Sequence, residues 1–111
     1  MAECLWGWLG MSIPAVLFEP IDSNAAPAGA VGIITARDSD KVVCYAIRCP
    51  GCRTMSALML TDRDGHPFWT VTAGNAQQPE AVTLSPSVHH TKEGGGCGWH
   101  GWLRNGQWEE C

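Results

Sequence analysis

The chain has 111 residues, a formal net charge of −4 and six cysteines. This length suits one domain with a modest core, and six cysteines are fewer than a disulfide scaffold of this size carries. Only seven residues are basic, and because affinity for nucleic acid depends on neutralising phosphates with Lys and Arg, we do not expect nucleic-acid binding.

The first 18 residues are apolar but match no targeting or membrane segment. They contain Glu3, no basic residue and an early Pro14. A signal peptide begins with basic residues, and a membrane span needs about 20 consecutive apolar residues. We therefore predict a cytoplasmic protein that has no membrane partner. Residues 1–12 are interpreted as an N-terminal extension, with Met11 as an alternative start.

Strand signals dominate the middle of the chain. After a proline-containing loop over residues 20–30, two β-branched runs at 31–36 and 41–48 flank the turn-like sequence ARDSD. These runs predict a hairpin, and residues 55–60 should pair with its second strand. Because residues 42–47 are apolar at every position, we expect that strand to be central, with both faces covered.

Two short segments have the spacing of metal knuckles, CPGC at residues 49–52 and CGWH at residues 97–100. In CPGC, proline sets φ for a tight turn and glycine tolerates positive φ, so both thiols can face one point. Two such pairs supply the four donors of a tetrahedral zinc ion. The sequence therefore predicts one structural Zn²⁺ bound by Cys49, Cys52, Cys97 and His100.

Three other interpretations of these donors remain open. A disulfide between Cys49 and Cys52 requires an oxidising compartment, which the missing signal peptide does not favour. A redox-active CxxC belongs at a helix N-terminus, whereas the flanks of CPGC are strand-like. A catalytic zinc ion needs an open coordination position and a nearby base, and no HExxH or HxE pattern occurs. If one of the four donors is wrong, Cys111 is the substitute.

Further strands are predicted over residues 68–72 and 81–84, after a turn at Asp64-Gly65 and on either side of a loop at 74–80. Residues 85–96 are polar and rich in glycine, which favours a loop.

Ser85 and Ser87 lie in this loop, where they flank Pro86. We expect them to cap a turn, or to hydrogen-bond the ring nitrogen of His100 that does not bind metal, rather than to act as nucleophiles. His89 and His90 are adjacent and point apart if extended. We expect them to decorate the loop without binding metal.

The clearest hairpin is at the C-terminal end, where Asn105-Gly106 is the preferred pair for a two-residue type I′ turn. This turn predicts the pairs Arg104 with Gln107, Leu103 with Trp108, and Trp102 with Glu109. Leu103 and Trp108 would face the core. On the other face, Arg104 would stack on Trp102 and neutralise Glu109.

These elements predict a mostly β fold, a small zinc-ribbon-like antiparallel sheet domain with two zinc knuckles. The single zinc-binding β domain should occupy residues 13–111.

The order of CPGC, Trp69-Thr70, the segment LSPS at 84–87 and CGWH followed by WLRNG resembles the DUF6527 family, over about residues 43–108. That family comprises small phage, prophage and bacterial proteins, some in operons with ubiquitin-like conjugation components. The resemblance implies a zinc-binding domain of phage or prophage origin, with Cys49, Cys52, Cys97 and His100 as ligands. It implies no settled activity.

We therefore predict a non-enzymatic interaction module that is stabilised by zinc and binds an unidentified protein partner. An exposed Trp beside Arg104 would suit such an interface. Two alternatives remain, a zinc-dependent hydrolase with an open metal position and a single-strand nucleic-acid binder that stacks bases on its Trp side chains.

Overall fold

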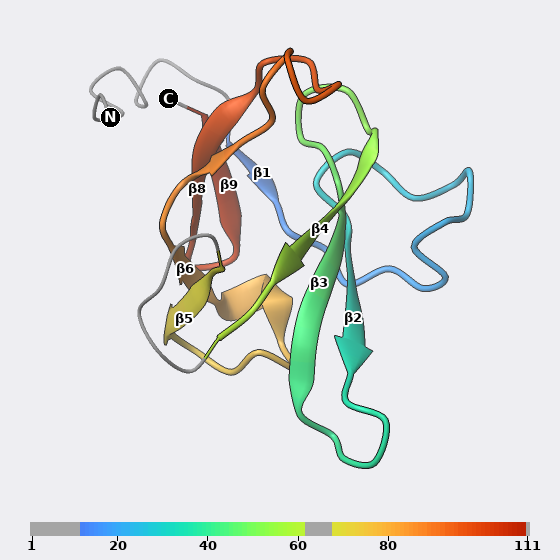
Figure 1. Ribbon diagram of the computed structural model, residues 1–111, viewed down its shortest axis with the longest axis vertical. Helices are drawn as coiled ribbons and strands as arrows, with labels where there is room; N and C mark the ends of the chain where they lie inside the picture. The colour runs from blue at the N-terminus through green and yellow to red at the C-terminus, as the bar shows by residue number, and fades with distance from the viewer. Residues whose placement is uncertain (1–11, 62–67, 111) are drawn as a thin grey trace.

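The computed structural model describes residues 12–61 and 68–110. Apart from Ser12, the predicted N-terminal extension lies outside these residues, as do the turn at Asp64-Gly65 and the substitute ligand Cys111. The elements in chain order (Figure 1) are β1 (Ser12–Pro14), β2 (Val31–Thr35), β3 (Val42–Arg48), β4 (Met55–Met59), β5 (Thr70–Ala73), the 3₁₀ turn η2 (Pro79–Ala81), β6 (Thr83–Ser85), β7 (Val88–His89), β8 (His100–Arg104) and β9 (Gln107–Glu110).

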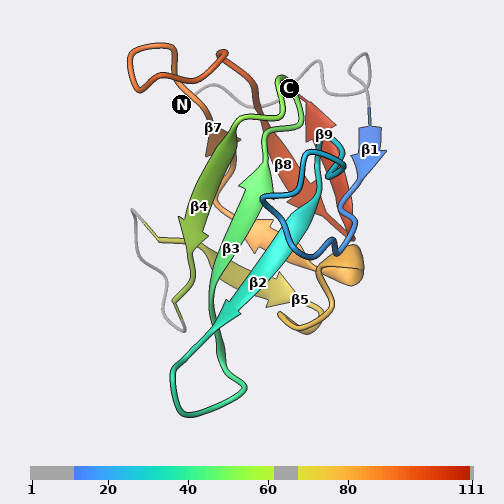
Figure 2. The same cartoon turned by 90° about the vertical axis from the view of Figure 1, so that its right-hand side faces the viewer.

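These strands form small antiparallel sheets, which confirms the predicted fold class. One sheet has the order β2-β3-β4, a second has the order β1-β9-β8-β7, and β5 pairs with β6. Figure 2 shows the first sheet in front of the second, and in Figure 1 the two stand side by side. In the described part of the chain, no helix is long and apolar enough to cross a membrane.

The core lies between these two sheets and draws side chains from both of them. Its largest fully buried member is Trp108 on β9. The indole N–H of Trp108 donates a hydrogen bond of 2.8 Å to the carbonyl oxygen of Gly29. The one polar atom of this side chain is therefore satisfied inside the core, as buried tryptophans require.

Strand β3 is central, as its apolar sequence predicts. It pairs with β2 on one side, where Val31 lies opposite Ile47, and with β4 on the other, where Cys44 lies opposite Met59. Both faces of β3 carry buried residues, with Tyr45 and Ile47 on one face and Cys44 and Ala46 on the other. The predicted return of β4 beside β3 is also confirmed.

The C-terminal hairpin has the predicted register, with Leu103 opposite Trp108 and Arg104 opposite Gln107. Asn105 and Gly106 have φ values of 49° and 75°, as a type I′ turn requires. The guanidinium carbon of Arg104 lies 4.6 Å from the ring centroid of Trp102.

Strand alternation separates the two faces of β8. Gly101 and Leu103 are buried, whereas His100, Trp102 and Arg104 are at least partly exposed. A side-chain nitrogen of Arg104 also lies 3.5 Å from a carboxylate oxygen of Glu109. His100 therefore stands on the outward face of the sheet, together with the predicted stack of Arg104 on Trp102.

The chain departs from prediction in the segment before β8. The predicted strand over 81–84 is shifted, because η2 occupies Pro79–Ala81 and β6 begins at Thr83. The predicted loop over 85–96 contains β7, whose Val88 and His89 pair with Gly101 and His100 of β8. This short strand is stabilised by its partner and not by its own composition, so the local sequence does not reveal it.

Candidate functional site

Three cysteines meet at one end of the molecule. Cys49 lies directly after β3, Cys52 lies in the following turn, and Cys97 comes from the loop between β7 and β8. Their sulfur atoms all lie within 4.8 Å of one another. The sulfurs of Cys49 and Cys97 are 3.7 Å apart. Two sulfurs bound to one tetrahedral zinc ion, each at about 2.3 Å from the metal, lie about 3.8 Å apart, so the observed separation matches. This cluster can bind a metal ion, and it is consistent with a zinc-ribbon-like fold.

The backbone of the CPGC turn holds Cys49 and Cys52 in place. The N–H of Cys49 donates to the carbonyl of Thr54 at 2.9 Å, and the N–H of Arg53 donates to the carbonyl of Cys49 at 2.8 Å. Arg53, with φ of 68°, adopts the left-handed conformation that the sequence predicts for Gly51. Gly51 is needed for space instead, because a Cβ there would lie 2.9 Å from the sulfur of Cys97.

The environment separates the acidities of the first two thiols. Burial raises the pKa of Cys49 to about 11. Hydrogen bonding from the Thr54 hydroxyl to the thiolate lowers the pKa of Cys52 to about 7. Metal binding requires deprotonated thiols, so Cys52 is more readily available as a thiolate than Cys49.

His100, the predicted fourth donor, lies outside this group of sulfurs. Its Nε2 atom is 2.9 Å from the hydroxyl oxygen of Ser87. The predicted hydrogen bond between a serine of this segment and His100 is therefore present. The physical reason for this position is strand alternation, because β8 begins at His100 and directs its side chain to the outward face of the sheet.

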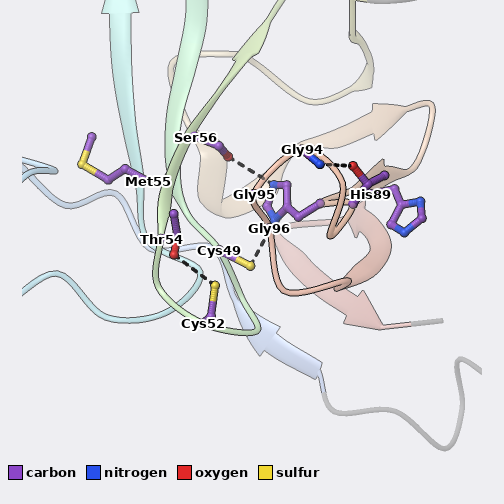
Figure 3. A pocket seen from close by; sticks show the side chains of 11 residues that line it. Cys49, Cys52, Thr54, Met55, Ser56, His89, Gly94, Gly95 and Gly96 are labelled. Atoms are coloured by element: carbon purple, nitrogen blue, oxygen red, sulfur yellow. Dashed lines mark hydrogen bonds between the residues drawn. The ribbon is translucent and has the colours of Figure 1, made fainter.

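His90 lies against the cluster, so the prediction that it merely decorates a loop is wrong. Its Nδ1 atom is 3.0 Å from the sulfur of Cys49, and its Nε2 atom is 3.1 Å from the hydroxyl oxygen of Ser56. A pocket of about 230 Å³ lies beside these groups. Figure 3 shows Cys49, Cys52 and Ser56 on one side of this pocket, with the glycine-rich loop across from them.

The β7–β8 pairing places a second histidine beside the Ser87–His100 pair. His89 lies directly opposite His100, and their rings stack with centroids 4.6 Å apart. Burial, and secondarily the charge of His89, lowers the pKa of His100. A lowered pKa favours the neutral imidazole, in which Nε2 of His100 can accept the hydroxyl proton of Ser87.

A serine whose hydroxyl contacts a neutral imidazole nitrogen is the arrangement of an activated nucleophile. Two sequence signals point toward it, the segment LSPS at 84–87 and the histidine of CGWH. The sequence predicted a hydrogen bond from this segment to His100, but as support for His100 in its role as a metal ligand.

A family model described as "Bacterial ubiquitination-like system serine protease (BubE)" matches residues 19–111. Neither a curated protein nor a solved structure matches the chain.

The match overturns one prediction and disfavours part of another. The assignment to DUF6527 is wrong, because the matching family is BubE, and a non-enzymatic module is not what a protease family supports. The earlier assignment rested on short motifs scattered over residues 43–108, whereas the family model covers nearly the whole chain. The chain belongs to the BubE family, the serine proteases of bacterial ubiquitination-like systems.

Proposed function

We propose that this protein is a serine hydrolase that cleaves acyl bonds formed by the C-terminus of a ubiquitin-like protein in a bacterial conjugation system. Ser87 is the nucleophile and His100 is the general base. The observation that carries this proposal is the distance of 2.9 Å between the hydroxyl oxygen of Ser87 and Nε2 of His100. The family's description supports both the reaction class and the kind of substrate.

In the proposed reaction, the hydroxyl proton of Ser87 passes to Nε2 of His100 as the serine oxygen bonds to the carbonyl carbon of the substrate. The resulting imidazolium then donates that proton to the leaving amine, the bond to the leaving group breaks, and an acyl-serine remains. A water molecule attacks this ester, again with His100 as the base. Hydrolysis releases a free carboxylate and restores Ser87.

Both partners of this pair are held by neighbouring structure. The carbonyl oxygen of Ser87 accepts a hydrogen bond of 3.4 Å from the indole N–H of Trp69, and β7 begins at the next residue. His100 is fixed by pairing with His89 on β7. Such support keeps nucleophile and base within reach without reorganisation, which is what efficient acyl transfer needs.

The proposal is tested by labelling the purified full chain with a fluorophosphonate, which reacts covalently with activated serines. We expect one adduct per chain, located at Ser87 by peptide mass spectrometry, and an equal extent of labelling in a matched Ser85→Ala variant. Cleavage of a reporter fused behind the ubiquitin-like protein of the same system should be blocked in the labelled protein. An adduct at Ser85, or active protein without an adduct at Ser87, would contradict the assignment.

The pH profile of the reaction should reflect the depressed pKa of His100. The imidazole acts as a base only when neutral, so kcat/KM is retained above the pKa of the folded protein and lost as the pH falls through it. Because burial and the charge of His89 lower this pKa from its ordinary value of 6.5, we expect the acid limb to have its midpoint below 6.5. A His89→Ala variant removes the neighbouring charge and should move that limb to higher pH. A limb at or above 6.5 in the wild-type protein would argue against His100 as the base.

We also propose that the three-cysteine cluster holds one zinc ion with a structural role. Thiolate donors favour zinc, and the separation of 3.7 Å between the sulfurs of Cys49 and Cys97 suits a tetrahedral shell. His100 lies outside the group of sulfurs, and the proposed chemistry uses the hydroxyl of Ser87, so it needs no metal-bound water. The zinc ion would join the end of β3, where Cys49 lies, to the loop between β7 and β8, where Cys97 lies.

A further inference from the structure

We infer that His90 is the fourth ligand of the metal site and that it binds the ion through Nδ1. His90 would thereby position β7, which follows Ser87 and pairs with His100 on β8. The inference rests on the proposed zinc ion and adds the residue that completes its shell. Its function in catalysis is indirect, because His90 contacts the cysteine cluster and Ser56 and not the hydroxyl of Ser87.

The first argument is the position of the ring. Nδ1 of His90 is 3.0 Å from the sulfur of Cys49. A nitrogen and a sulfur that bind the same tetrahedral zinc ion lie about 3.5 Å apart. Nδ1 does not belong to the group of atoms that lie within 4.8 Å of one another. Completing the shell therefore requires Nδ1 to move about half an ångström away from the sulfur of Cys49. It must also approach at least one of the other two sulfurs by roughly an ångström or more. The adjacent pocket of about 230 Å³ provides the room.

The second argument is the partner of the opposite ring nitrogen. Nε2 of His90 lies 3.1 Å from the hydroxyl oxygen of Ser56 on β4. Metal-binding histidines typically donate their second N–H to a fixed acceptor, which sets the tautomer and the ring orientation. With the proton on Nε2 donated to Ser56, the lone pair of Nδ1 faces the sulfurs.

The third argument is strand alternation around the β7–β8 pairing. Val88 is buried and His89 is exposed, so the next side chain along the strand, that of His90, points back inward. The backbone fixes this arrangement, because the N–H of His90 donates to the carbonyl of Trp99 at 2.8 Å and the N–H of Gly98 donates to the carbonyl of His90 at 2.7 Å. Cys97 is thus held next to the segment after β7 that contains His90.

The same arrangement connects the metal site to the reactive pair. His90 would anchor one end of β7 to the metal, and its neighbour His89 stacks on His100. Ser87 precedes the same strand. Loss of the fourth ligand should therefore loosen β7 and increase the distance between the serine hydroxyl and the imidazole.

The test compares variants of the full chain purified with zinc, using metal content by mass spectrometry and zinc affinity by competition with a chelator. His90→Ala should weaken zinc binding by more than the roughly 10–100-fold that loss of an outer hydrogen bond costs. Ser56→Ala should weaken it within that range. The matched control His89→Ala removes the adjacent imidazole and should leave the zinc affinity unchanged.

A His90→Cys variant keeps the inference testable if His90→Ala does not fold. Replacing zinc by Co²⁺ reports the ligands directly, because each thiolate adds charge-transfer absorption. We expect the cobalt form of His90→Cys to keep a tetrahedral spectrum, with charge-transfer intensity that rises in proportion to the added thiolate. Equal zinc affinity in wild type and His90→Ala, or no added thiolate absorption in His90→Cys, would overturn the assignment.

The outcomes separate this inference from the two proposals on which it bears. A wild-type chain that binds neither zinc nor cobalt would refute the metal site and the inference together. A metal-loaded wild type with no fluorophosphonate adduct would refute the reaction but leave His90 as a ligand. Activity should fall in His90→Ala and return in His90→Cys, whereas His100→Ala should stay inactive with its metal content unchanged.

Discussion

A Ser87→Ala variant should lose the ability to cleave the ubiquitin-like protein fusion, with kcat reduced by roughly 10³-fold or more. Removing the hydroxyl removes the only atom that bonds to the substrate in the proposed reaction, and the imidazole of His100 then has no proton to accept from it. KM should change little, because the hydroxyl contributes little to binding the remainder of the substrate. The measurement is steady-state cleavage followed by gel densitometry or reporter release.

Three controls make this result specific. Ser85→Ala lies two residues away on β6 and should retain activity. His100→Ala should lose about as much activity as Ser87→Ala, and the double variant little more, because residues that act as a unit are not additive. All variants should keep the melting temperature of the wild type. Full activity in Ser87→Ala at unchanged stability would assign the reaction to another residue.

Removal of the metal should unfold the protein. Structural zinc contributes on the order of 10 kcal/mol of folding free energy, which equals the whole stability of a typical domain, about 5–15 kcal/mol. A Cys49→Ser, Cys97→Ser double variant, or wild-type protein treated with a strong chelator, should therefore lose its cooperative thermal transition. Circular dichroism and metal content, measured on the same samples, would check this.

Cys44 provides the matched control for this experiment. It is buried on β3 and lies outside the group of three sulfurs. Cys44→Ala should leave the metal content unchanged and cost about 1 kcal/mol, as the loss of one small buried group does. A double variant at Cys49 and Cys97 that melts like the wild type would show that the cluster does not stabilise the fold.

Those two experiments test different parts of one molecule. The proposed metal site concerns thiols at the end of β3 and in the loop before β8, whereas the proposed reaction concerns the outward face of β7 and β8. A serine hydrolase with a separate structural metal predicts that Ser87→Ala retains its zinc. It also predicts that metal-free protein fails in every assay that needs a fold.

Local signals in the sequence were sufficient for much of the architecture. The continuous apolar run of β3 indicates a strand covered on both faces. Successive side chains point to opposite faces of a strand, so an unbroken apolar run places apolar side chains on both. Asn105-Gly106 determines the register of the C-terminal hairpin, since a two-residue type I′ turn leaves only one way to pair the flanking strands. The CPGC spacing likewise brings Cys49 and Cys52 together within one turn.

What the sequence by itself determined is therefore the three cysteines that meet in the cluster and most of the strands around them. Only the tertiary structure decided which histidine lies in which site. That outcome depends on β7, a strand of two residues that pairs with β8 among the strands the structure describes. Once they pair, alternation directs His89 and His100 outward, beside Ser87, and His90 inward, to Cys49. Since a shift of one residue would exchange these faces, the division depends on a long-range register and not on local spacing.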